Sequence, residues 1–131
     1  MKNETMDWVF FANNDMIAAK AIIEHTELTG EAAFHCQQAI EKYFKGYLEE
    51  HGKEIHKIHD LLKLYLDVKS IHDWNLDEDL LEKISKIYTT TRYPGHIGMT
   101  PEGRIPTIEE IQCYWEFTKT VKAIFTELVG K

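Results

Sequence analysis

The chain has 131 residues, 44% of them apolar and 28% charged, and its formal net charge is −7. This size and composition are typical of one globular domain that needs no disulfide or metal for its stability. The acidic balance argues against sequence-independent binding along a nucleic-acid backbone, because that mode depends on a broad positive surface. No stretch of the sequence is apolar for long enough to cross a bilayer.

Residues 1–7 are polar and mixed in charge, without the basic start and apolar run of a secretory signal. We therefore expect a single cytoplasmic domain over residues 1–131, with no membrane contact. Cys36 and Cys113 each lie among apolar residues at helical spacing. That setting predicts two small, reduced core residues rather than a disulfide or a pair of metal ligands.

The first predicted helix covers about residues 5–25, where apolar residues recur at three- and four-residue steps. This stripe contains Trp8, Phe11, Ala12, Ala18, Ala19 and Ile22. Asp15 falls on the same stripe, and a carboxylate on a buried face needs a partner. We expect Asp15 to be a structural acceptor for a neighbouring helix, the alternative being that it lines a polar pocket.

Residues 31–51 show the strongest helical pattern in the chain. The apolar side of this helix contains Ala32, Ala33, Cys36, Ala39, Ile40, Tyr43, Phe44, Tyr47 and Leu48. On the polar side, Gln37, Glu41 and Lys45 recur at four-residue steps, with Lys42 beside them. Such a row favours a solvated face with weak ion pairs.

Two further helices are predicted before the first proline. A short one covers about residues 60–68, and a fourth begins at Asn75 or Asp77, either of which could cap it. The fourth helix must stop near Tyr93. Pro94 has no amide hydrogen to donate, and it disfavours helical geometry in the residue before it.

Residues 93–106 are rich in glycine and proline, which predicts a long loop of a kind that is usually functional. Both arginines of the chain, Arg92 and Arg104, fall at this loop. A guanidinium group suits phosphate better than a lysine does, the alternative being chance placement on a solvated loop. The last helix then opens with a capping box, Thr107 to Glu110.

The sequence contains no strand pattern, and its helices are joined mostly by brief connections. We therefore predict an all-α fold, an antiparallel up-and-down four-helix bundle with one extra short helix. Trp8, Tyr43 and Trp115 lie on the apolar stripes of these helices. That position predicts packing in the core rather than stacking on nucleic-acid bases.

Three segments together resemble the HEPN domain family: residues 33–48, residues 59–61 and residues 91–94. The resemblance extends over nearly the whole chain, including the first helix with Asp15 and the last helix after its long loop. It implies a helical bundle, commonly a homodimer, whose polar groups gather in a cleft that holds a nucleotide or an RNA phosphate.

The resemblance also implies a partner. Many small prokaryotic members are paired with a separate minimal nucleotidyltransferase, often as a toxin-antitoxin couple. We therefore expect a binding module that acts with such a partner and uses no cofactor. The residues expected to contact the ligand are Arg92, Tyr93, Lys42, Lys45, His59 and Asp15.

An alternative is metal-independent RNA cleavage, because some members of the family are ribonucleases with an arginine and a histidine separated by four to six residues. Arg92 would hold the phosphate and His96 would transfer the proton. Here only three residues separate the two, and they include Pro94 and Gly95. This departure favours binding without cleavage, and a further alternative is a structural dimer that presents a helical face to another protein.

His51, His56 and His59, followed by Asp60, form a histidine-rich segment. Imidazoles with a carboxylate can bind a transition metal. Their spacing matches no standard metal motif, and the resemblance implies no metal. We therefore expect no metal site.

Overall fold

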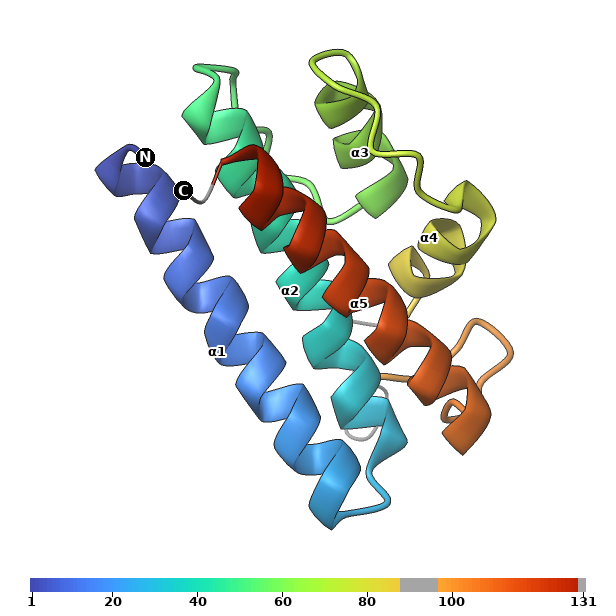
Figure 1. Ribbon diagram of the computed structural model, residues 1–131. Helices are drawn as coiled ribbons and strands as arrows, with labels where there is room; N and C mark the ends of the chain where they lie inside the picture. The colour runs from blue at the N-terminus through green and yellow to red at the C-terminus, as the bar shows by residue number, and fades with distance from the viewer. Residues whose placement is uncertain (88–96, 130–131) are drawn as a thin grey trace.

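The computed structural model describes residues 1–87 and 97–129, which form five helices (Figure 1). These are α1 (Asn3–His25), α2 (Thr29–Glu50), α3 (Leu61–Lys69), α4 (Glu78–Ser85) and α5 (Ile108–Leu128). The described residues contain no strand, so the all-α prediction is confirmed. Three helices are long and two are short, whereas four long helices were expected.

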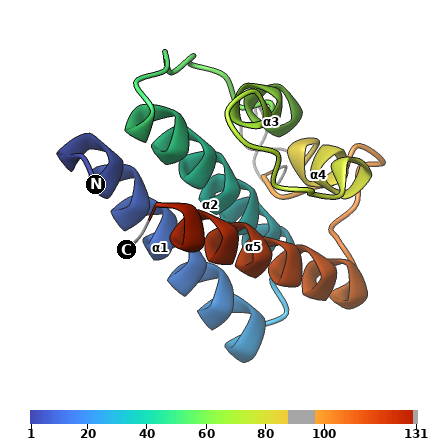
Figure 2. The same ribbon diagram turned by 45° about the horizontal axis from the view of Figure 1, so that its top comes forward.

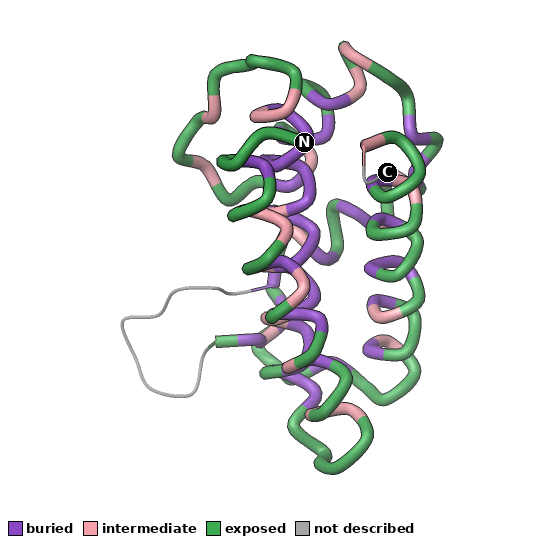
Figure 3. The backbone as a smooth tube through the Cα atoms, turned by 60° about the vertical axis from the view of Figure 1, so that its left-hand side comes forward, coloured by how far each residue is buried: buried purple, intermediate pink, exposed green. Residues whose placement is uncertain are grey.

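Helix α2 lies at the centre of the bundle and contacts each of the other helices. Helices α3 and α4 lie on the side of α2 away from α1 (Figure 2). Helix α1 is antiparallel to α2. The amide of Lys2, just before the start of α1, donates to the side chain of Glu50, the last residue of α2. Because α2 is covered by the other helices, buried residues lie along almost its whole length (Figure 3).

Helix α5 runs in the same direction as α2. The hydroxyl of Thr29, at the start of α2, donates to the Pro106 carbonyl just before α5. Further along both helices, the ring of Phe125 lies against Gly46. The chain between α2 and α5 therefore returns from one end of the bundle to the other, as an up-and-down path requires.

The predicted caps agree with the structure. Asp77 caps α4 by accepting from the Leu80 amide, so of the two candidates it is Asp77, not Asn75, that begins this helix. Thr107 and Glu110 form both hydrogen bonds of the capping box at the start of α5. These interactions depend only on residues close in sequence, which is why the sequence was sufficient to predict them.

Helix α4 ends at Ser85, earlier than the expected stop near Tyr93. The side-chain amide of Gln37 donates to the carbonyls of Ser85 at 3.1 Å and Ile87 at 3.0 Å. The hydrogen-bond donor of these two carbonyls is therefore a side chain of α2, far away in sequence, and not the amide of a further helical turn. Tyr93 lies outside the described residues.

The irregular segment predicted before α5 is confirmed for residues 97–106, and residues 93–96 lie outside the described part of the chain. Gly98 has a φ of +85° and lies against Gly30 of α2. A Cβ at Gly98 would lie 2.0 Å from the Gly30 carbonyl oxygen. Only glycine combines this φ with this close approach, so the segment packs directly on the start of α2.

The aromatic core is centred on Tyr43, Phe44 and Tyr65, all of which are fully buried. Trp8 and Trp115 are only half-buried, so their assignment to the core was partly wrong. Phe11, which was also placed on the buried stripe of the first helix, has 53% of its surface exposed. No helix within the described ranges is both long and apolar enough to span a bilayer.

The two cysteines differ. Cys36 is buried, and desolvation raises the pKa of its thiol to about 12, so it stays protonated. Cys113 is exposed on α5, and the prediction of a core cysteine is wrong there. Helix α5 meets the bundle through the face that carries Ile111, Tyr114 and Val121, and Cys113 lies off that face.

Candidate functional site

The polar row of α2 is buried. Gln37, Glu41 and Lys45 expose only 1%, 4% and 6% of their surface, so the expectation of a solvated face is wrong for these three residues. The reason is the central position of α2, whose neighbours cover it on several sides. Buried charges need partners, and the partners of these residues define the site.

One group of charged residues joins α1 to α2, and we call it the Asp15 cluster. The two carboxylate oxygens of Asp15 contact His35 Nδ1 at 2.8 Å and Lys42 Nζ at 2.5 Å. Asp15 is buried, whereas the side chains of His35 and Lys42 are 29% and 23% exposed. Asp15 therefore has the interhelical partners that its position on a buried stripe required.

A second group, which we call the Glu41 cluster, lies on the neighbouring side of α2. Glu41 contacts Lys45 Nζ at 3.2 Å through one carboxylate oxygen and His59 Nδ1 at 2.9 Å through the other. Lys45 also lies over the ring of Trp8 of α1, 5.7 Å from its centroid. Glu41 and Lys45 are buried, but the His59 side chain is 62% exposed.

Both clusters orient a histidine in the same way. An ionised carboxylate only accepts hydrogen bonds, so Nδ1 of His35 and of His59 must be the donor. The Nε2 atom of each ring is then left to accept a proton or, once protonated, to donate to an anion. Because His59 is the more exposed, its Nε2 is the more accessible to a ligand.

Arg104 is paired with Glu110, away from both clusters. Its guanidinium donates to Glu110 at 2.7 Å and 3.3 Å. This hydrogen bond, together with one from the Thr107 amide, lowers the pKa of Glu110 to about 2. Arg104 thus holds the start of α5, and of the two arginines at the loop only Arg92 stays a candidate ligand contact.

Of the residues expected to contact a ligand, the structure pairs Asp15 with Lys42 in one cluster and places Lys45 and His59 on Glu41 in the other. Arg92, Tyr93 and His96 lie outside the described residues. Sequence reasoning missed His35 and Glu41 as members of the site. The spacing of seven between His35 and Lys42, two turns of one helix, was the available signal for the first.

The histidine-rich segment does not converge. His51 Nδ1 contacts the Tyr47 carbonyl oxygen at 2.9 Å, whereas His59 contacts Glu41. Over residues 1–87 and 97–129, no group of three or more histidine, cysteine or acidic side chains is placed to hold a metal ion.

Comparison with known proteins identifies the family. A family model described as "HEPN domain" matches residues 5–128. The chain belongs to the HEPN domain family. The likeness covers both clusters and all five helices, and it makes the chain a nucleotide- and RNA-associated module in the general sense of that family.

A solved structure has the same fold as this HEPN domain. It is the crystal structure of TT1696 from Thermus thermophilus, a protein that is 27% identical in sequence to this chain. The similarity covers 96% of this chain and 98% of that chain, with a TM-score of 0.72. A search of curated proteins gave no match.

Proposed function

We propose that this HEPN module binds a nucleotide or an RNA phosphate on the face of α2 that carries the Glu41 cluster. In this proposal His59 and Arg92 contact the phosphate and Tyr93 contacts the rest of the ligand. Lys45 contributes positive charge within the Glu41 cluster, and Lys42 and Asp15 contribute from the neighbouring Asp15 cluster. The module acts with a separate minimal nucleotidyltransferase, as one half of a toxin-antitoxin pair.

The observation that carries the proposal is the position of Gln37. Its side chain holds the Ile87 carbonyl against α2, one helical turn from Glu41. Ile87 is five residues before Arg92, and five residues span at most about 18 Å. The chain length between Ile87 and Arg92 is therefore compatible with the Arg92 contact that we propose.

The local charge supports an anionic ligand despite the net charge of −7. Each cluster sets one carboxylate against one lysine and one histidine. The clusters are therefore neutral when the histidines are neutral and positive when they are protonated. An anion that contacts His59 Nε2 favours the protonated ring, and Arg92 would add a permanent charge.

Equilibrium binding of ATP, GTP and a short single-stranded RNA to the full chain tests the proposal. We expect saturable binding that raises the melting temperature, and loss of that shift in Arg92→Ala and in His59→Ala. Arg104→Ala is the matched control, because it removes the other arginine of the chain and should keep the ligand-induced shift. Equal shifts in all variants, or no shift in the wild type, would contradict the proposal.

A second candidate is metal-independent RNA cleavage, and one observation favours it: Glu41 orients His59 as a carboxylate orients a catalytic imidazole. Against it stands the short spacing between Arg92 and His96. We expect binding without turnover when the protein is incubated with single-stranded RNA and EDTA. Cleavage that disappears in His59→Ala or His96→Ala would reverse this order.

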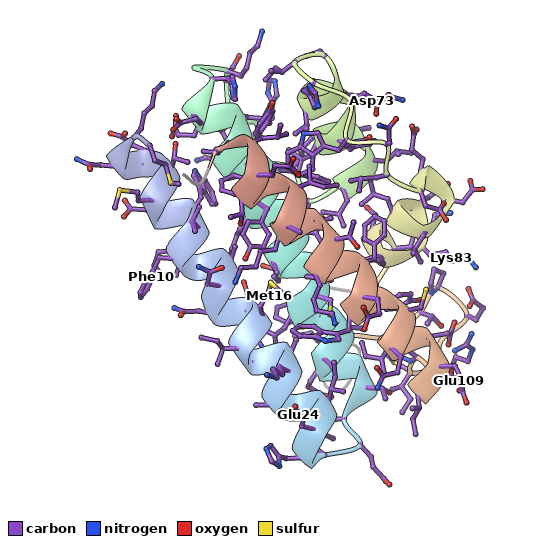
Figure 4. The ribbon with its side chains drawn as sticks, in the orientation of Figure 1. Phe10, Met16, Glu24, Asp73, Lys83 and Glu109 are labelled. Carbon is purple, nitrogen blue, oxygen red and sulfur yellow. The ribbon has the colours of Figure 1, made fainter. Side chains whose placement is uncertain are left out.

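We also propose that the module is a homodimer. Phe10 and Phe11 are 59% and 53% exposed on α1, where Phe10 projects from the bundle (Figure 4). Two such aromatic residues side by side form a surface that a second copy would cover. Light scattering should give a dimeric mass for the wild type and a monomeric mass for Phe10→Asp with Phe11→Asp. A monomeric wild type at micromolar concentration would remove this part of the proposal.

A further inference from the structure

A groove runs between α1 and α5, separate from the two charged clusters. It has a volume of about 860 Å³. Both helices pack on α2 but make few contacts with each other, which leaves the space between them open to the outside. Met16 lies between α1 and α5 in Figure 4, on the side of α1 that faces the groove.

The floor and walls of the groove are apolar. Met16 and Ile17 line it from α1, and Trp115 and Ala123 line it from α5. Below them, the Tyr43 hydroxyl of α2 donates to Asn13 and contacts the Met16 sulfur, so the floor is closed and fixed. Ile17 is 68% exposed and forms part of the apolar lining of the groove.

The rim of the groove is positively charged in an otherwise acidic protein. Its charged lining residues are Lys20, Lys119, Lys122 and one acid, Glu127. Lys119 is paired with Glu116 at 3.0 Å. Within the described part of the chain, Lys20 and Lys122 have no ion-pair partner, and they come from opposite sides of the groove.

We infer that this groove binds an acidic amphipathic helix of a partner protein. The lining of α5 extends from Trp115 to Glu127, which corresponds to about 18 Å of helix and matches three turns of a docked helix. An apolar stripe at i, i+3 or i+4 and i+7 would fill the groove, and acidic residues beside that stripe would face Lys20 and Lys122. The complementary charge gives the site its selectivity.

A peptide titration of the full chain tests this inference, with intrinsic tryptophan fluorescence and the anisotropy of a labelled peptide as readouts. The probe is a three-turn helix with a leucine stripe and glutamate on both flanks. Its matched control keeps the leucine stripe and replaces each glutamate with lysine. We expect saturable binding of the acidic peptide and binding of the basic peptide at least roughly tenfold weaker.

Two variants act on the groove in different ways. Lys20→Glu with Lys122→Glu reverses two charges of the rim and should weaken binding of the acidic peptide roughly tenfold. The control is Lys63→Glu with Lys83→Glu on α3 and α4, which makes the same charge change away from the groove and should leave the affinity unchanged. Ala123→Trp fills the groove at an exposed position and should abolish binding. Circular dichroism shows that each variant is folded.

Three results would overturn the inference: no saturable binding, equal binding of the acidic and basic peptides, or unchanged affinity in both groove variants. Light scattering on Ala123→Trp distinguishes a partner helix in the groove from a second copy of the chain. A dimeric wild type that becomes monomeric in this variant would show that a second copy of the chain, rather than a partner helix, covers the groove. Nucleotide binding is measured separately and does not enter this test.

Discussion

The Asp15 and Glu41 clusters have the same composition, one carboxylate with one lysine and one histidine, but they differ in where the exposed group lies. In the Asp15 cluster both the lysine and the histidine are partly exposed, and all three residues belong to α1 and α2. In the Glu41 cluster the lysine is buried and the histidine, which precedes α3, is largely exposed.

This difference separates two uses of the same chemistry. The Asp15 cluster joins two long helices, and its lysine and histidine side chains are exposed enough to be hydrated. In the Glu41 cluster, buried Lys45 is paired with the buried carboxylate of Glu41, and the same carboxylate orients the solvent-exposed imidazole of His59. We propose that the first arrangement is structural and that the second holds the ligand.

The largest effect is expected from removing the Glu41 carboxylate. Glu41→Ala leaves Lys45 buried and charged without its partner, and this should lower the free energy of unfolding by about 3 kcal/mol. Urea denaturation followed by circular dichroism measures it. The control is Glu41→Leu with Lys45→Met, which removes both charges together. If the double variant is as unstable as Glu41→Ala, the cost is not that of an unpaired lysine.

Removing the Asp15 carboxylate should cost less. Asp15→Ala leaves His35 and Lys42 without an acceptor, but both side chains are exposed enough to be hydrated. We expect a loss of roughly 1–2 kcal/mol in the same urea experiment. A loss as large as that of Glu41→Ala would remove the distinction between the clusters.

Glu110 is a carboxylate outside both clusters that serves as a reference. The sign of its contribution to the pH dependence of stability follows from its lowered pKa. Arg104 and the Thr107 amide lower its folded-state pKa to about 2 from the ordinary value of 4.5. The ionised form therefore stabilises the fold above about pH 4.5, and this contribution is lost as the pH falls towards 2.

The expected size of the Glu110 contribution is about 1 kcal/mol, because the pair faces solvent and is screened. Glu110→Gln should lose this amount at pH 7, and the difference from the wild type should shrink as the pH falls below 4.5. Denaturation curves over that pH range measure it. A difference that stays constant with pH would mean that the capping bond, not the charge, is what Glu110 contributes.

The smallest effect on stability, and the sharpest test of function, concerns the two histidines. His59→Gln should change the free energy of unfolding by less than about 0.5 kcal/mol, since His59 is largely exposed. It should nevertheless remove most of the nucleotide-induced rise in melting temperature. His35→Gln is its counterpart in the Asp15 cluster and should keep that rise. If His35→Gln is the variant that loses it, the ligand lies on the other side of α2.

Much of the fold could be predicted from the sequence because it depends on neighbours in the chain. The stripes of α1 and α2 and the capping box at Thr107 follow from local spacing. The end of α4 could not be predicted, since Gln37, nearly fifty residues away, supplies the donors that end it. Cys113 and Phe11 were misplaced because a stripe shows which residues are apolar, not how much of the stripe a neighbour covers.

The candidate site, too, could be predicted from the sequence only in part. Asp15, Lys42, Lys45 and His59 were named from residue type and family resemblance, and each of them lies on α2 or pairs with a residue of α2. Their division into two clusters was not predictable, and Arg92, Tyr93 and His96 stay predictions because they lie outside the described residues.

The sequence alone thus determined the helical class, the helix starts and the types of charged residue available, because periodicity and capping are short-range. The tertiary structure decided which charges are buried and which imidazole is exposed. Burial depends on which helix packs against which face, and only that packing turned the polar row of α2 from a solvated surface into paired charges with His59 at their open edge.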